Sequence, residues 1–264
     1  MQNGKPRVAV FKFSSCSGCQ LAILNLEDEL LDLVGAVEIA YFLEARRLPE
    51  SRPYDITFVE GSVTTQEEVE RIIQIREDSG LLIALGSCAT AGGVQSLKNY
   101  KDVSHLIDVV YEHPEYIETL EKSTPISEHV KVDLELWGCP VNKYQILEAV
   151  SALLQNRRPN LPQHSLCLER KALGRVCVTV ANGTPCLGPI TKAGCGAVCP
   201  SVGRGCYGCF GPSQDMDLEA FIPILKEHTK SDEEAVQLIR TICGYTPEFE
   251  KAVQMILAEE VVHE

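Results

Sequence analysis

The chain has 264 residues, of which 45% are hydrophobic and 23% are charged, and its formal net charge is −13. This length suits one large or two ordinary domains, and the hydrophobic fraction suffices for a normal core. The acidic balance argues against a nucleic-acid-binding surface, which would be basic. Because there is no long apolar run and no secretory signal after the N-terminal methionine, we expect a cytoplasmic protein without a membrane span.

The first part of the chain alternates short apolar runs with helical patterns. The apolar runs predict strands at residues 7–13, 36–42, 56–59, 81–85 and 130–136. Helical spacing predicts helices at 20–34, at 66–78 behind a capping box of Thr65 and Glu68, and at 142–154. The run at 81–85 is apolar throughout, so we expect it to be buried on both faces. Strands separated by helices indicate a doubly wound, flavodoxin-like α/β domain with a parallel sheet.

The stretch from 89 to 129 is harder to assign, and we expect a long loop with short helices near 105–111 and 115–122. After residue 156 the composition changes, and the prolines at 159 and 162 mark a linker. Residues 167–212 hold one apolar stretch, 176–181, that is long enough for a strand, and three short helices follow at 217–226, 232–242 and 247–258. We therefore expect two domains, 1–156 and 157–264. The cysteine-rich part of the second cannot fold on its own apolar surface, so a bound group must hold it.

Twelve cysteines in such a chain point to metal or redox chemistry more than to disulfides. Four of them follow predicted strands directly: Cys16, Cys19, Cys88 and Cys139. Because the carboxyl ends of parallel strands share one edge of a sheet, these thiols are expected to meet there. Four thiolates at one point need an iron–sulfur cluster or a zinc ion. Structural zinc uses compact Cys-x2-Cys pairs, so the wide spacing favours iron and sulfide.

A second group of cysteines lies in the predicted second domain. Its members are Cys167, Cys177, Cys186, Cys195, Cys199, Cys206 and Cys209. The Cys-x2-Cys and Cys-Pro elements within this group resemble the ligand pattern of ferredoxin-like clusters. Many glycines lie between them, and glycine lets the backbone approach inorganic sulfur closely.

The ordered motifs resemble the small subunit of nickel–iron hydrogenases over essentially the whole chain. They are Ser-Cys-Ser-Gly-Cys, Val-Glu-Gly-Ser-Val, Gly-Ser-Cys-Ala and Gly-Cys-Pro, which follow the first, third, fourth and fifth predicted strands. Three later motifs resemble the delta subunit of cytosolic, bidirectional NADP-linked hydrogenases, also called sulfhydrogenases. These are Thr-Pro-Cys-Leu-Gly-Pro, Gly-Cys-Gly-Ala-Val-Cys-Pro and Gly-Cys-Tyr-Gly-Cys-Phe-Gly-Pro.

This resemblance implies a division of roles along the chain. The four cysteines of the first group would hold a proximal 4Fe–4S cluster that faces a nickel–iron site in a separate large subunit. The second group would hold a medial and a distal cluster, with the partition of its cysteines left open. Electrons would pass through the three clusters to flavin and iron–sulfur subunits that reduce NAD(P), or in reverse. The chain lacks the paired Cys-x2-Cys motifs of a large subunit, so we expect an electron carrier with no catalytic residue of its own.

Two positions depart from the pattern that the resemblance implies. Relatives commonly show Cys-x-x-Cys where this chain has Cys167-Leu-Glu-Arg170, so seven cysteines remain for eight ligand positions. Glu169, Cys243, an external ligand or a 3Fe–4S cluster would each resolve the deficit, whereas the permanently charged Arg170 is a poor ligand. Leu21 stands where many relatives place a glutamate, which puts a proton route through that carboxylate in doubt.

Two further residue types are candidates near the clusters. Glu60 ends the third predicted strand beside the proximal site, and we interpret it as a structural carboxylate in preference to a proton-transfer group. The histidines lie in polar or loop contexts, so we expect surface histidines and no histidine-ligated distal cluster. They are His105, His113, His129, His164, His228 and His263.

Three alternatives stay open at this point. The same fold carries a cluster in the quinone-reducing subunit of respiratory complex I, although that subunit is expected to use adjacent cysteines and to lack the second domain. A hydrogenase small subunit can also serve a heterodisulfide-reductase partner. A zinc-stabilised scaffold is the third alternative, and it would be colourless where clusters are brown.

Overall fold

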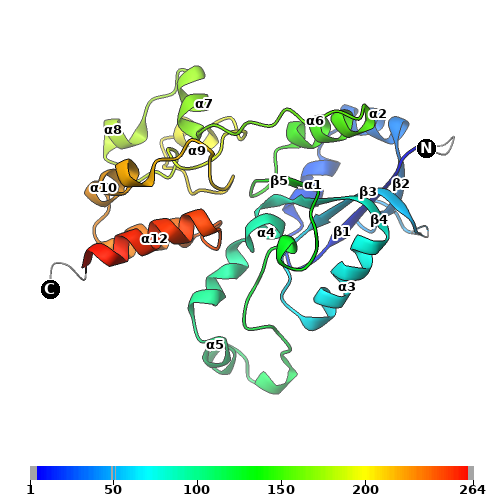
Figure 1. Ribbon diagram of the computed structural model, residues 1–264, viewed down its shortest axis with the longest axis horizontal. Coiled ribbons are helices and arrows are strands. Elements are labelled where there is room, and N and C mark those ends of the chain that lie inside the picture. The colour runs from blue at the N-terminus through cyan, green and yellow to red at the C-terminus, as the bar shows by residue number, and fades with distance from the viewer. Residues whose placement is uncertain (1–4, 49, 51, 261–264) are drawn as a thin grey trace. The chain divides into compact units, whose positions relative to one another are not determined.

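The computed structural model describes residues 5–48, 50 and 52–260 (Figure 1). The chain divides into two compact units, Met1–Asn160 and Leu161–Glu264. In the part of the chain that the structure describes, no helix is both long and apolar enough to cross a membrane.

A five-stranded sheet organises the first unit. All neighbouring strands are parallel, and their order is β2-β1-β3-β4-β5. The strands are β1 (Arg7–Lys12), β2 (Glu38–Phe42), β3 (Tyr54–Glu60), β4 (Ser79–Leu85) and β5 (Leu134–Leu136). This is the order of flavodoxin-like sheets, in which ligands bind beyond the carboxyl ends of the strands. The predicted α/β fold class is confirmed.

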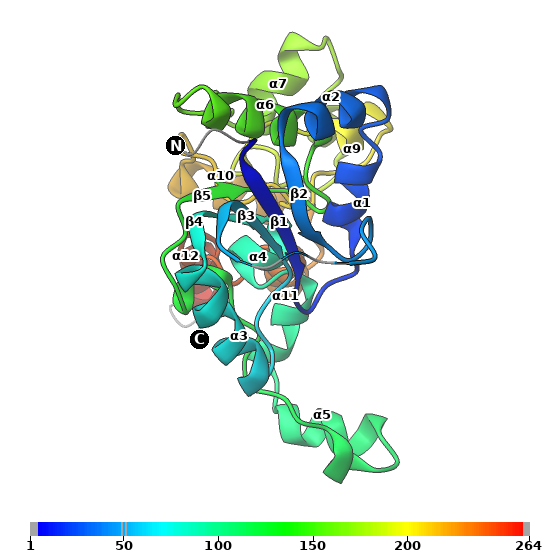
Figure 2. The same cartoon turned by 90° about the vertical axis from the view of Figure 1, so that its right-hand side faces the viewer.

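Helices cover both faces of this sheet. They are α1 (Gly18–Leu24), α2 (Asp28–Ala36), α3 (Gln66–Glu77), α4 (Gly86–Ala91), α5 (Val103–Val110) and α6 (Lys143–Leu154). Short 3-10 helices lie at Val94–Tyr100, Pro114–Tyr116 and Ile126–Glu128. Figures 1 and 2 show α2 and α6 on one side of the sheet and α3 on the other, while α5 stands away from it.

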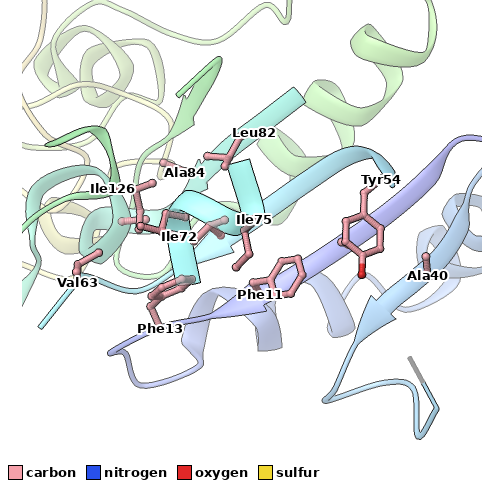
Figure 3. Close-up of a cluster of buried hydrophobic side chains, with 13 residues drawn as sticks. Phe11, Phe13, Ala40, Tyr54, Val63, Ile72, Ile75, Leu82, Ala84 and Ile126 are labelled. Atoms are coloured by element: carbon pink, nitrogen blue, oxygen red, sulfur yellow. The ribbon is translucent and has the colours of Figure 1, made fainter. Parts of the chain in front are cut away.

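The core below α3 shows how the sequence pattern produces this layering. Ile72 and Ile75 point from α3 toward aromatic side chains of the strands (Figure 3). One of these, Phe11 on β1, stacks on Tyr41 with ring centroids 4.2 Å apart. Burying side chains of this size stabilises the fold by roughly 1.5–3 kcal/mol each. The sheet is therefore a well-anchored platform for the loops at its edge.

The strands end side by side in register. Lys12 pairs with Glu60, Glu60 with Leu85, and Leu85 with Leu136. The segments that carry the first four cysteines all leave the sheet just after this row. Their starting points are therefore set by backbone pairing and not by the loops themselves.

The second unit is built from short helices and long irregular segments. The helices are α7 (Leu166–Ala172), α8 (Val178–Asn182), α9 (Val198–Ser201), α10 (Leu218–His228), α11 (Asp232–Arg240) and α12 (Pro247–Glu260). The last three match the predicted closing helices. Side-chain caps start α10 and α11, where Asp217 accepts from the Ala220 N–H and Ser231 from the Glu234 N–H.

The strand predicted at 176–181 is wrong, because this segment contains helix α8. Val180 is 87% exposed. A β-branched residue favours a strand only where a sheet surface can receive it, and no strand lies beside this segment in the described chain. Gly183 closes the helix in the left-handed conformation, with φ of +64°.

Four smaller expectations also need correction. The helix predicted at 20–34 is interrupted between α1 and α2, where Leu26 turns fully into the core. The helix predicted at 115–122 is one 3-10 turn, and β5 is shorter than the run at 130–136. At the start of β4, Leu81 is 36% exposed, so only the rest of that run is buried on both faces.

Candidate metal centres

The loop after β1 carries Cys16 and Cys19 and is anchored to the loop after β3. Ser14 and Ser62 exchange two backbone hydrogen bonds of 3.2 and 3.0 Å. The Ser14 hydroxyl also lies 2.6 Å from Thr64 Oγ1 and donates to Glu68 Oε1 at 3.1 Å. The two residues of the predicted capping box have different contacts. Thr65 caps α3, and the Glu68 carboxylate accepts a hydrogen bond from the loop that carries the cysteines.

The four thiols of the first group lie close enough to influence one another's ionisation. Burial raises the pKa of Cys19 far above its ordinary value, against one hydrogen bond from the Val141 N–H, and Glu60, Cys88 and Cys139 raise it further. Burial raises the pKa of Cys88 to about 11, and the charges of Cys139 and Cys16 add to this. The pKa of Cys139 is raised by burial and then by Cys16. The thiols on three separate loops are therefore electrostatic neighbours, and their binding of one cluster stays a prediction.

Glycines leave room for these sulfur atoms. Gly86 has φ of +82°, and a Cβ there would overlap the Cys19 Sγ. Gly93 has φ of +63°, and a Cβ there would lie 2.7 Å from the Cys88 Sγ. The backbone thus forms a cradle around sulfur that any larger residue would fill.

Glu60 is buried beside the first cysteine loop. Its Oε1 accepts the Cys19 N–H at 3.0 Å, and its Oε2 accepts from Gln20 Nε2 at 2.8 Å. The carboxylate thereby joins the end of β3 to the start of α1. These contacts are those of a positioning group, and both donors are left unsatisfied without it.

Sequence reasoning missed the polar residues that connect the loops. Gln95 Nε2 donates to the Ser14 carbonyl oxygen at 2.6 Å, and the same amide lies 3.5 Å from the Cys88 Sγ. The sequence feature that could have indicated these Gln95 contacts is the Gly92-Gly93 pair after Cys88, where the chain turns back toward the site. Leu21 is 51% exposed, next to the buried Gln20.

In the second unit, three cysteines line a cavity of about 210 Å³. They are Cys167 on α7, Cys177 before α8, and Cys186. Burial raises the pKa of Cys186, against hydrogen bonds from the N–H groups of Cys206 and Gly188 to its sulfur. These two bonds measure 3.2 and 3.4 Å.

The other four cysteines of the second group are Cys195, Cys199, Cys206 and Cys209, and none of them lines this cavity. Burial raises the pKa of Cys195, against hydrogen bonds from Val198 and Ala197 N–H groups, and nearby Cys199 raises it further. The Cys206 Sγ accepts the Gly208 N–H at 3.4 Å, and Cys209 is a charged neighbour of the same thiol. This group therefore has its own backbone donors.

Two proposed substitutes for the eighth ligand are already engaged elsewhere. The Glu169 carboxylate accepts the N–H groups of Gly194 at 3.2 Å and Gly196 at 3.1 Å. Cys243 is fully buried in the helical part of the unit and does not line the cavity.

The donor set fits iron–sulfur clusters. The eleven cysteines of the two groups supply soft sulfur atoms, and backbone N–H groups are aimed at several of them, which is the surrounding that clusters require. A bound iron would replace the thiol proton, and its positive charge would lower the raised pKa values of these thiols. Among the described residues, no three His, Cys, Asp or Glu side chains gather closely enough to ligate one metal ion.

Known proteins with similar sequences and folds are consistent with this donor set. Residues 16–153 match the family model described as NADH ubiquinone oxidoreductase, 20 Kd subunit. Sulfhydrogenase 2 subunit delta of Pyrococcus furiosus is 37% identical over 90% of this chain and 100% of its own length. A vhu-type F420-non-reducing hydrogenase chain of Methanocaldococcus jannaschii is 35% identical over 81% of this chain and 85% of its own length.

A solved structure shares the fold and part of the sequence. A chain in the crystal structure of an NAD+-reducing NiFe-hydrogenase in the H2-reduced state matches with a TM-score of 0.56 and 28% identity. The match covers 60% of this chain and 96% of that one. The chain therefore belongs to the NADH ubiquinone oxidoreductase 20 kDa subunit family and, within it, to the small, delta-type subunits of nickel–iron hydrogenases.

Proposed function

We propose that this hydrogenase subunit relays electrons through three iron–sulfur clusters. One end of the relay is a nickel–iron site in a separate large subunit, and the other is a flavin and iron–sulfur partner that reduces NAD(P). Each cluster, when bound, accepts and donates electrons singly, and the chain itself supplies the thiolates and N–H donors that hold and tune it. The chain carries electrons and does not split hydrogen.

The observation that carries this proposal is the register of the strand ends. Glu60, Leu85 and Leu136 lie in one row, and this shared row supports a common site for the four cysteines in the segments that leave the strand ends. Cys16, Cys19, Cys88 and Cys139 would ligate the proximal 4Fe–4S cluster in the first domain. Glu60 would orient Cys19 through the N–H bond described above.

The second domain would hold the medial and distal clusters. The three cysteines of the cavity, Cys167, Cys177 and Cys186, form one ligand set, and the remaining four form the other: Cys195, Cys199, Cys206 and Cys209. Cys186 and Cys206 support this close arrangement, since the N–H of one residue donates to the sulfur of the other. The two clusters would therefore be near neighbours, as electron transfer requires.

One relative's name supports the nicotinamide-reducing partner. An NAD-reducing hydrogenase HoxS subunit delta of Cupriavidus necator is 29% identical over 61% of this chain. The second candidate is a heterodisulfide-reductase-type partner, and the F420-non-reducing relatives carry no nicotinamide acceptor in their names. The partner that co-purifies with this chain decides between them.

Metal analysis of the anaerobically purified chain, with whatever binds it, tests the cluster assignment. Three clusters predict about twelve irons and as many sulfides per chain, or about eleven irons if one is a 3Fe–4S type. Cys88→Ser is expected to lose about four irons, and the matched control Cys243→Ala none. Zinc without sulfide, or equal iron in both variants, would overturn the proposal.

Activity of the co-purified complex tests the partner assignment. Nickel should appear only when a larger subunit is present, and hydrogen should then drive the reduction of NAD+ or NADP+. A complex that contains nickel and oxidises hydrogen with a viologen dye, but not with either nucleotide, would favour the second acceptor.

A further inference from the structure

The cavity that holds three cysteines of the second unit also presents three other polar side chains. They are Arg170, Thr179 and His228. The rest of the lining is apolar or carries only backbone polar groups, with prolines at 185, 189 and 200 and with Leu166, Phe221 and Leu225. Three thiolates leave one iron of a 4Fe–4S cluster without a protein ligand. Among the residues that line the cavity, these three are the remaining candidates to complete the site.

Two of these residues are unsuited to bind iron. The Thr179 hydroxyl donates to the Thr184 carbonyl oxygen at 2.9 Å, across the end of α8. Arg170 is permanently protonated and has no lone pair to give. Its guanidinium donates to the Arg175 carbonyl oxygen, while its buried Nε has no hydrogen-bond partner in the described structure.

His228, in contrast, offers a nitrogen ligand at the cavity wall. It is the last residue of α10 and is half-buried, where the sequence favoured a surface position. No hydrogen bond or ion pair engages its imidazole among the described residues. Its Nδ1 would lie 3.8 Å from a Cβ at Gly183, so the ring sits against the C-terminal end of α8.

The short helix α8 thus has a ligand candidate at each end. Cys177 is its N-cap and Gly183, beside His228, is its C-cap. Five helical residues rise about 7.5 Å.

We propose that a nitrogen of His228 is the fourth protein ligand of the cluster that Cys167, Cys177 and Cys186 hold. This inference rests on the proposed function, because it presupposes a cluster in the cavity. Neutral imidazole is an established ligand of iron, including iron in clusters where histidine replaces cysteine. His228 thereby takes the place of the thiol that the resemblance predicts at position 170.

The proposal has an electrostatic consequence. A neutral imidazole in place of a thiolate removes one negative charge from the cluster, and the Arg170 charge already acts on Cys167 and Cys186. Both effects favour the reduced form, since reduction adds negative charge. This cluster is therefore expected to have a higher reduction potential than it would with four thiolates.

Nitrogen spectroscopy of the reduced, full-length chain tests the ligand directly. The chain is purified anaerobically at pH 8, where imidazole is neutral, with and without 15N-labelled histidine. Pulsed electron paramagnetic resonance should show a directly coupled histidine nitrogen in the unmodified chain. His228→Cys should lose this coupling, keep its iron, and shift the midpoint potential of one cluster downward. His164→Ala, which removes an exposed histidine of the same unit, should retain both the coupling and the potential.

The outcomes separate this inference from the function on which it rests. A full iron content without any histidine coupling, or with a coupling that survives in His228→Cys, overturns the ligand assignment alone. A 3Fe–4S signal from the oxidised unmodified chain does the same, because the fourth corner would be absent. Iron at about four per chain means that the second unit holds no cluster, and the proposed function then fails with it.

Discussion

Gly86 lies at the turn from β4 into α4, with the Cys19 sulfur directly against it. Its φ of +82° belongs to the left-handed region, which side chains with a Cβ rarely adopt. A Cβ would also lie 3.2 Å from the Gly138 carbonyl oxygen, in the loop that carries Cys139. One residue without a side chain thus allows three cysteine loops to approach one another.

Replacing this glycine tests whether the approach matters for cluster binding. Gly86→Ala should lower the free energy of unfolding by about 1–2 kcal/mol through backbone strain alone, and more through overlap with Cys19. It should also reduce iron by about four atoms per chain. Urea unfolding of the cluster-free chain and metal analysis of the loaded chain measure the two effects.

A second glycine serves as the control. No atom lies within 4 Å of a Cβ at Gly35, which is inside α2. Gly35→Ala should therefore stabilise the chain by roughly 0.4–1 kcal/mol and leave its iron unchanged. Equal behaviour of the two variants would show that the space around Cys19 is not needed.

At the scale of elements, Asp133 ties the edge of the sheet to a helix. Its Oδ2 accepts the Leu82 N–H at 2.9 Å and the Arg76 Nη1 at 2.6 Å. Burial acts to raise the pKa of Asp133, but these hydrogen bonds outweigh it and hold the pKa below the ordinary value of 3.8. The short strand β5, and the Cys139 loop that follows it, are thereby held against β4.

This contact predicts a pH dependence of stability. A carboxyl group with a lowered folded-state pKa stabilises the fold above its unfolded-state pKa, and this contribution is lost as the pH falls through the lower folded value. Asp133→Asn should therefore be less stable than the unmodified chain at pH 7, and the difference should shrink below about pH 4. Urea unfolding midpoints between pH 3 and 7 measure this difference.

Asp32→Asn, at an exposed position in α2, serves as the control and should be as stable as the unmodified chain at each pH. A loss of stability in Asp133→Asn that stays constant with pH would contradict the lowered pKa of Asp133.

At the scale of the whole molecule, different interactions stabilise the interior of each unit. The first has an apolar core packed on its sheet. In the second, α10, α11 and α12 bury residues such as Ile222, Ile239 and Phe249. The segment 183–213, which lies between α8 and α10 in the chain, buries apolar residues such as Leu187 and Phe210, and several of its N–H groups donate to cysteine sulfur.

Removal of the clusters should therefore loosen one segment selectively. When iron is stripped with an oxidant and a chelator, amides in 183–213 should exchange hydrogen markedly faster, while those in β1, β3 and β4 remain protected. Hydrogen-exchange mass spectrometry before and after stripping measures this. Unchanged exchange in 183–213, or opening of the sheet at the same time, would show that the clusters do not hold this segment.

The sequence by itself determined the layout of the first unit. Apolar runs separated by helical patterns predict a parallel sheet, and the rule that ligands bind at the carboxyl ends of its strands predicts that Cys16, Cys19, Cys88 and Cys139 meet. The inference about the sheet succeeds because it depends on residue spacing and backbone pairing, which are local or nearly so, whereas the meeting of the four thiols stays a prediction. The family motifs added the identity of the bound group, which spacing alone left between iron–sulfur and zinc.

Only the tertiary structure decided which side chains support those sulfur atoms. Glu60 and Gln95 contact the first cysteine loop from strand and helix positions far along the chain. Val178 and Val180 lie in a helix because no strand is there to receive them, and His228 reaches the cavity because the end of α10 lies against the end of α8. Propensity and spacing describe neighbours in sequence, whereas these contacts arise from long-range packing, and that is why the sequence alone could not predict them.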